Sequence, residues 1–113
     1  MPTRHAELDR VFQALSHPTR RTVVQRLTRG PAAVSELAEP FDIALPSFLQ
    51  HLDVLEASGM VESAKRGRVR TYRLTPRPLR VAETWLGKQR AEWEQRLDQL
   101  DEYLRHLDTE HDS

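Results

Sequence analysis

The chain has 113 residues and no cysteine, and its 17 basic side chains balance its 17 acidic ones. A chain of this length forms one domain with a modest core, to which dimerisation would add apolar burial. The lack of cysteine excludes disulfides, thiolate metal sites and cysteine nucleophiles, and it favours a reducing compartment. No apolar run approaches the roughly 18 residues of a membrane span, and the polar start does not resemble a signal peptide. We therefore expect a cytoplasmic protein with no membrane partner.

The charges are segregated along the chain. Residues 17–30 carry a net charge of +4 and residues 62–82 carry +6, whereas residues 31–61 and 83–113 each carry −5. A total charge of zero argues against a nucleic-acid partner, but the distribution matters more than the total. These blocks predict a basic face and an acidic face on one small body.

Four helices are predicted before residue 60. The first has apolar residues at the spacing i, i+3, i+4, i+7, and the second begins at Pro18, which suits a first helical turn. The fourth is followed by Gly59, in the position where a left-handed cap is common. The expected helices span residues 4–16, residues 18 to the stop at 30–31, residues 34–39 and residues 45–58.

A hairpin and a long helix are predicted after residue 60. The β-prone runs 60–64 and 69–74 flank the basic tip Lys65-Arg66-Gly67-Arg68. The long helix is expected over residues 79–107, where apolar side chains step by 4, 3, 4 and 3 residues, as in a helix that packs against another helix. Packing on the first helix accounts for part of this stripe, and a homodimer is the natural cover for the rest.

This order of elements is that of a winged helix-turn-helix. We predict a mainly α fold with a small β-hairpin: about five helices, a two-stranded wing and a long C-terminal dimerisation helix. The whole chain, residues 1–113, is expected to be one domain, with the helix-turn-helix at 33–59 and the wing at 60–75. In this arrangement the helix from Leu45 to Ser58 is the one that would enter a DNA groove.

The chain also resembles the ArsR/SmtB-type transcriptional repressors. The resemblance rests on three stretches: ALSHPTRR (14–21), SELAEPFDIALPSFLQHLDVLEASGMV (35–61) and KRGRVRTYRL (65–74). It implies a homodimer built from the first and last helices, with two recognition helices in successive major grooves of an inverted-repeat operator and the wings beside them. The residues expected at this dimer interface are Leu8, Val11, Phe12, Trp93, Leu97, Leu100, Leu104 and Leu107.

The expected recognition helix lacks positive charge, since no Lys or Arg lies between Phe41 and Ser63. Phosphate contacts supply affinity and base contacts supply specificity, so the two tasks can lie on different elements. The expected phosphate or minor-groove contacts are Arg20 and Arg21 of the second helix and Lys65, Arg66, Arg68 and Arg70 of the wing. The expected major-groove contacts are Ser47, Gln50 and His51, with Phe48 as a contact to a thymine methyl group.

Alternative roles remain open for several of these residues. Phe48 could equally be a core or interface aromatic, Gln50 could be merely exposed, and His51 could pack inside. Two positions depart from the family pattern. Ala44 stands where family members often place a Ser or Thr cap, which forgoes about 1 kcal/mol, and Leu49 stands where a small polar residue is frequent. The second departure would shift the contact set by one residue.

No metal cofactor is expected. Many members of the family release DNA when metal binds to cysteines in the third helix or to Asp, His and Glu on the last helix. This chain has no thiol, and its acidic and imidazole groups near the last helix do not follow the family spacing. The groups considered were His5, Asp101, His106, Asp108, Glu110 and His111. A solvated polar helix end is the better interpretation of them.

Catalysis is not expected, because no nucleophile, phosphate-binding Gly pattern or acid/base set can be named. The leading hypothesis is a homodimeric, sequence-specific DNA-binding repressor that acts by promoter occupancy, without a metal. One alternative is a winged-helix module that binds another protein, and another is a repressor that senses metal through the last helix. The arginines at the hairpin tip favour DNA, since an interaction module has no need of them.

Overall fold

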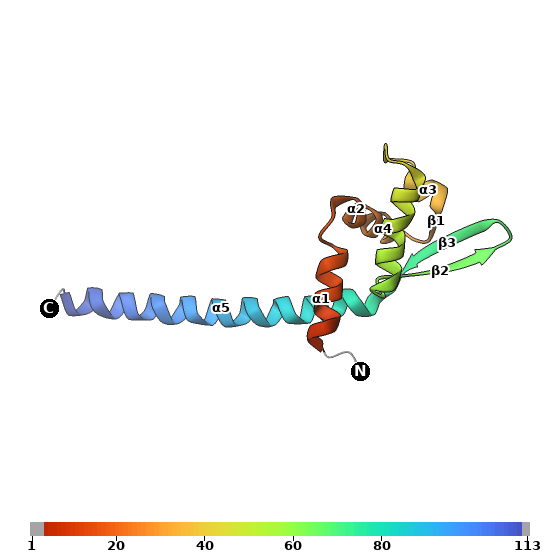
Figure 1. The fold of residues 1–113 in the computed structure, drawn as a ribbon. Helices are drawn as coiled ribbons and strands as arrows, with labels where there is room; N and C mark the ends of the chain where they lie inside the picture. The colour runs from red at the N-terminus through yellow and green to blue at the C-terminus, as the bar shows by residue number, and fades with distance from the viewer. Residues whose placement is uncertain (1–3, 112–113) are drawn as a thin grey trace. The chain divides into compact units, whose positions relative to one another are not determined.

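The computed structural model describes residues 4–111, which contain five α-helices and one three-stranded sheet (Figure 1). The contacts divide the chain into two compact units, one ending at Ala82 and the other beginning at Glu83. The elements are α1 (Arg4–Ala14), α2 (Pro18–Leu27), β1 (Ala32–Ala33), α3 (Val34–Ala38), α4 (Leu45–Ala57), β2 (Val61–Arg66), β3 (Val69–Leu74) and α5 (Pro76–His111). The winged helix-turn-helix order predicted from the sequence is confirmed.

The ends of the short helices follow from local chemistry. Pro18 occupies the first turn of α2, and the His17 side chain caps this helix by accepting a hydrogen bond from Thr19 N at 3.1 Å. Helix α4 begins after Ala44 without a side-chain cap, as the sequence indicated. It is followed by Gly59 at φ +79°, the left-handed conformation that glycine adopts without steric cost.

The predicted two-stranded wing is confirmed, and a third short strand that was not predicted joins it in one sheet. Strands β2 and β3 form the predicted hairpin, and the two-residue strand β1 pairs antiparallel with β3 in the order β1-β3-β2 (Figure 1). Ala32 lies opposite Tyr72, and Ala33 lies opposite Thr71. Two alanines have neither β-propensity nor periodicity, so no sequence pattern marks β1 as a strand. The strand attaches the start of the helix-turn-helix to the wing.

One apolar core holds the first unit together. Its largest fully buried side chains, in descending volume, are Phe48, Leu52, Leu55, Met60, Val11 and Val23. Leu8 is 7% exposed and Val11 is 1% exposed, because α1 turns this face onto the core of its own chain. Their assignment to a dimer interface was therefore wrong: side chains buried within one chain have no surface left for a second copy. Phe12, on the same helix, is 40% exposed.

Helix α5 is longer than predicted at both ends. It begins at Pro76, three residues early, because Pro76 and Pro78 both fall in a first turn that lacks backbone N–H partners in any case. From Glu83 onward it carries the acidic block, with ion pairs Arg90–Glu94 at 4.0 Å and Arg96–Glu92 at 3.6 Å one turn apart. The exposed large apolar residues on this part are Trp85, Leu86, Trp93, Leu97, Leu100, Tyr103, Leu104 and Leu107.

Within residues 4–111, none of the helices has the length and apolar character to cross a membrane.

Candidate nucleic-acid interface

The first turns of α4 present a neutral polar surface. Ser47 and Gln50 are exposed, and Leu49 beside them is 37% exposed. Phe48 is 1% exposed and packs against the ring of Phe41, with centroids 5.5 Å apart. The proposed contact of Phe48 with a thymine methyl group was therefore wrong, since its ring faces the core. The candidate base-reading set on α4 reduces to uncharged side chains that can donate and accept hydrogen bonds.

The carboxylate of Glu56, near the end of α4, accepts a hydrogen bond from the wing. The Ser63 hydroxyl on β2 donates to Glu56 Oε1 on α4 at 2.8 Å, and Arg70 Nη1 on β3 donates to the same Ser63 oxygen at 2.8 Å. This chain of contacts ties the end of α4 to the wing. One N–H group of Arg70 is therefore already bonded to protein, although the side chain remains exposed.

The wing carries its remaining positive charge at and beside a two-residue turn. Gly67, at φ +66°, and Arg68 form this turn, so Lys65 and Arg66 lie in strand β2 and not at the tip. Successive strand residues point to opposite faces, which places Lys65 and Arg66 on different sides of the ribbon. Within residues 4–111, the exposed side chains of Lys65, Arg66 and Arg68 have neither a hydrogen bond nor an ion pair to protein. These three cations are available to a polyanion.

The two arginines of α2 differ from those of the wing, because protein groups bind them. Arg20 is half-buried, and its Nε donates to Ala14 O at 2.7 Å while Nη2 donates to Gln13 O at 3.1 Å. Arg21 is exposed, and its Nη1 donates to Leu15 O at 2.7 Å. Both side chains therefore donate hydrogen bonds to carbonyl groups at and just beyond the end of α1. These bonds satisfy carbonyls that lack a partner within the helix, and the positive charges stabilise the negative end of the helix dipole.

His51, on α4, contacts two residues at the start of α2. Arg20 Nη1 is 2.9 Å from His51 Nδ1, and the His51 ring lies 4.3 Å from that of His17, tilted by 37°. Partial burial, then the neighbouring charges of His17 and Arg20, lower the pKa of His51 from its ordinary value. No sequence pattern marked His17 as a site residue, although a histidine directly before the proline of a helix start is in place to act as a cap.

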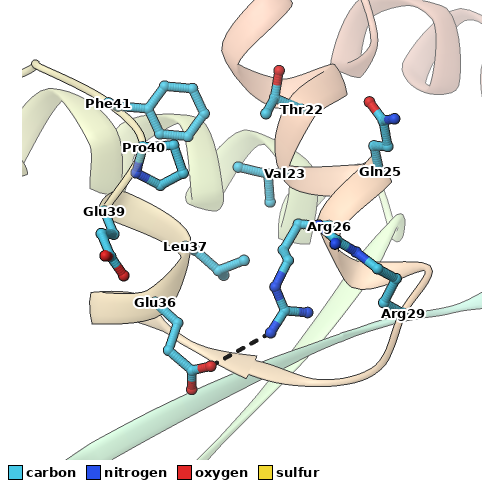
Figure 2. A pocket seen from close by; sticks show the side chains of 10 residues that line it. All are labelled: Thr22, Val23, Gln25, Arg26, Arg29, Glu36, Leu37, Glu39, Pro40 and Phe41. Carbon is cyan, nitrogen blue, oxygen red and sulfur yellow. Dashed lines mark hydrogen bonds and ion pairs between the residues drawn. The ribbon is translucent and has the colours of Figure 1, made fainter.

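A pocket of about 440 Å³ lies between α2, α3 and the segment after α3 (Figure 2). Figure 2 shows Arg26 reaching toward Glu36, and their closest atoms, Nη2 and Oε2, are 3.4 Å apart. Glu36 also accepts a hydrogen bond from Ala33 N at 3.3 Å. The pocket lining is Thr22, Val23, Gln25, Arg26, Arg29, Glu36, Leu37, Glu39, Pro40 and Phe41. This mixture of both charges and apolar groups matches no single ligand class.

The candidate metal ligands are not brought together in the part that the structure describes. Within residues 4–111, no group of three or more His, Asp and Glu side chains could hold a metal ion. His5 is exposed on α1, and Asp101, His106 and Asp108 are exposed on α5. The side chains of Glu110 and His111 lie outside the described residues.

The sequence is similar to known transcriptional regulators. A helix-turn-helix domain family matches residues 15–64. The HTH-type transcriptional regulator Rv2034 of Mycobacterium tuberculosis is 41% identical over 80 residues, which cover 71% of this chain and 75% of that protein. The transcriptional repressor SdpR of Bacillus subtilis is 30% identical over 79 residues, which cover 70% of this chain and 88% of that protein.

Solved structures agree with these sequence matches. The crystal structure of the ArsR family transcriptional regulator RHA00566 is 51% identical, with a TM-score of 0.77 over 83% of this chain and 97% of that one. The homodimeric winged helix-turn-helix DNA-binding domain Mb0332 of Mycobacterium bovis is 26% identical, with a TM-score of 0.59 over 79% of this chain and 81% of that one.

Proposed function

Because the chain belongs to the ArsR family of winged helix-turn-helix transcriptional regulators, we propose that it is a homodimeric repressor that binds an inverted-repeat operator and acts by occupying a promoter. Relatives named as repressors, such as SdpR, support the direction of regulation, and the homodimeric Mb0332 domain supports the assembly. A twofold protein places two copies of α4 about one helical turn of DNA apart, which requires an inverted repeat.

The observation that carries this proposal is the free positive charge of the wing. The side chains of Lys65, Arg66 and Arg68 are exposed and have no hydrogen bond or ion pair to protein within residues 4–111. Clustered cations repel one another unless a polyanion neutralises them, and each phosphate contact releases counterions from DNA. We assign these three side chains to the phosphate backbone or the minor groove beside α4. Arg21 and Arg70 are exposed, but each already donates a hydrogen bond to a protein group, so we expect them to contribute less to DNA affinity.

Gln50 and Ser47 supply the base contacts in this proposal. Both are exposed on the first turns of α4, which is the part of a recognition helix that enters the major groove. A Gln side chain pairs with the N6 and N7 edge of adenine, whereas Ser accepts or donates with any base. The neutral helix therefore sets sequence preference, and the arginines of the wing set most of the affinity.

The apolar stripe of α5 is the proposed dimer surface. Trp93, Leu97, Leu100, Leu104 and Leu107 repeat at heptad spacing and are all exposed. A stripe of this length on a chain of 113 residues is apolar surface that a second copy would cover. Phe12 of α1 is 40% exposed and is also proposed as a residue that contacts a second copy.

Repression is proposed to be independent of metal. The chain has no thiol to act as a soft ligand, and a Zn²⁺ site needs three or four fixed donors. His106 and Asp108 are exposed on α5 and stand in the reverse order to the family's Asp-x-His pair. Release of the operator DNA therefore depends on a signal other than metal, or on the concentration of the protein itself.

The test is a binding titration with the DNA immediately upstream of the protein's own gene, at two salt concentrations. We expect tight binding to an inverted repeat, weaker binding to a scrambled duplex, and a steep loss of affinity with salt. Arg68→Ala should weaken binding to both duplexes and reduce the salt slope by about one. Equal affinity for both duplexes, or a slope that Arg68→Ala leaves unchanged, would contradict the proposal.

A further inference from the structure

One guanidinium joins three helices in the first unit. Arg20, on α2, donates to the carbonyl oxygens of Ala14 and Gln13 at the end of α1, and to the Ser16 hydroxyl at 3.4 Å. Its Nη1 also reaches His51 Nδ1 on α4 at 2.9 Å. These contacts use most of the five N–H groups of an arginine. Arg20 is therefore poorly placed to bind a phosphate and well placed to hold helices together.

His51 can take part in this contact only as a neutral ring. Arginine stays protonated in proteins and only donates hydrogen bonds, so Nδ1 must accept and Nε2 must carry the ring proton. The neighbouring His17 ring caps α2, where its Nδ1 accepts a hydrogen bond from Thr19 N. The two rings are in contact at 4.3 Å. The contact therefore places a neutral His51 ring beside one fixed positive charge.

We propose that Arg20 and His51 are a positioning pair that sets α4 relative to α1 and α2, and that protonation of His51 weakens DNA binding in mild acid. The inference rests on the proposed function and deepens it. His51 directly follows Gln50 on α4, so any shift of this pair displaces the side chain that reads the bases. A displacement of this kind removes affinity without removing a single phosphate contact.

The charges around His51 all act in the same direction. From the start of α2 it faces His17 and Arg20, while the groups joined to it through Arg20 are two carbonyls of α1 and the Ser16 hydroxyl after that helix, none of which titrates. On α4 itself, the residues three and four positions away carry no titratable group. Burial, His17 and Arg20 together lower the pKa of His51 below the ordinary value of about 6.5. The contact is therefore intact above that pH and is lost as the pH falls through the lowered pKa.

The sign of the pH effect separates positioning from direct contact. A His51 that touched phosphate or a base acceptor would bind more tightly in acid, because the imidazolium attracts the polyanion. A His51 that positions α4 binds more weakly in acid, because its protonated Nδ1 can no longer accept from Arg20. The two roles predict opposite slopes of affinity against pH.

The main experiment measures operator affinity of the full chain from pH 7.5 to pH 5.5 at constant ionic strength. We expect the dissociation constant of the unchanged protein to rise by about threefold or more. His51→Asn keeps an acceptor oxygen near the place of Nδ1 and cannot titrate, so it should bind within about twofold of the unchanged protein at pH 7.5 and lose most of the acid effect. His106→Asn, on exposed α5, is the control that should leave the slope unaltered.

A second comparison tests Arg20 itself. Arg20→Lys keeps the charge but loses the fork that reaches α1 and α4 together, so we expect about a tenfold loss of affinity with an unchanged salt slope. Arg68→Lys, at the free tip of the wing, should retain affinity within about threefold. If Arg20→Lys binds as well as Arg68→Lys and Arg20→Gln lowers the salt slope, Arg20 is a phosphate contact and the inference is wrong.

NMR of the His51 ring tests the pair in the absence of DNA. The inference requires a neutral ring protonated at Nε2, with a titration midpoint below the ordinary histidine value that moves upward in Arg20→Lys. Protonation at Nδ1, or an ordinary midpoint, overturns the inference. Failure to bind any operator, with this signature present, would refute the proposed function alone. Operator binding that tightens in acid would refute the positioning role alone.

Discussion

Lys65 on β2 and Arg70 on β3 are direct partners in the antiparallel register of the wing, so two positive side chains lie opposite each other on one face. Like charges in this position destabilise a sheet. Arg70 turns to the Ser63 hydroxyl at 2.8 Å, which leaves Lys65 alone on the exposed strand. Three strand positions away, Glu62 and Arg73 are also direct partners, but they carry opposite charges and lie 3.0 Å apart. The wing thus pairs its charges near the core and leaves them unpaired near the tip.

Removing one charge of the like-charged pair should have opposite effects on stability and on binding. We expect Lys65→Gln to leave the free energy of unfolding unchanged or to raise it by a few tenths of a kcal/mol, because an exposed repulsion is relieved. The same variant should weaken DNA binding by a few-fold, because a phosphate contact is lost. Urea denaturation and a DNA titration measure the two effects. Arg73→Gln is the matched control, and it should slightly lower stability instead.

Replacing Gln50 should change specificity more than affinity. We expect Gln50→Ala to lower discrimination at one operator position by about 1–3 kcal/mol, because the contact to a base edge is lost. The salt dependence should stay the same, since no charge is removed. Competition between the operator and its single-base variants gives the measurement. An equal loss of affinity for every sequence would show that Gln50 contacts the backbone.

Phe48 should matter for folding and not for base readout. Phe48→Ala should lower the free energy of unfolding by about 3–5 kcal/mol, because it removes a ring that is 1% exposed and packed on Phe41. Leu49→Ala, at the next and more exposed position, should cost well under half of that. Chemical denaturation measures both variants. A small effect of Phe48→Ala on stability, together with a specific loss at thymine positions, would restore its DNA role.

A charge in the α5 stripe should separate the dimer. We expect Leu100→Asp or Leu104→Asp to give a folded monomer in sedimentation equilibrium, because a buried unpaired carboxylate opposes an apolar interface. Glu102→Gln, on the same helix, is a control that should stay dimeric. Leu8→Ala should instead lower the stability of each chain, since Leu8 lies in the core of the first unit. A dimer that survives both aspartate variants would place the interface elsewhere.

Metal should not release the operator. Adding stoichiometric Zn²⁺ or Ni²⁺ during a DNA titration is expected to leave the affinity unchanged, because the chain has no thiol and its candidate ligands on α5 do not follow the family spacing. Release that a chelator reverses would contradict metal-independent repression. His106→Asn would then show whether α5 supplies a ligand.

Much of the architecture was predictable because it rests on local patterns. Pro18 and Gly59 mark helix ends through their restricted or permitted φ angles, and the apolar spacing of α1 and α5 follows the period of a helix. The wing followed from two β-prone runs around a glycine. Strand β1 was not predicted from the sequence. Its two alanines pair with β3 through backbone hydrogen bonds, and backbone pairing does not appear in the pattern of side chains.

The sequence by itself determined the order of the elements, the segregation of charge and the family of the protein, since each depends on residue type and spacing along the chain. Only the tertiary structure decided which candidate side chains stay free. Phe48 turned out to face the core, and Arg20 and His51, 31 positions apart, turned out to bind each other. The physical reason is that the same residue type can be exposed and available to DNA, or buried and hydrogen-bonded within the protein. Which of them occurs depends on neighbours that folding brings from elsewhere in the chain.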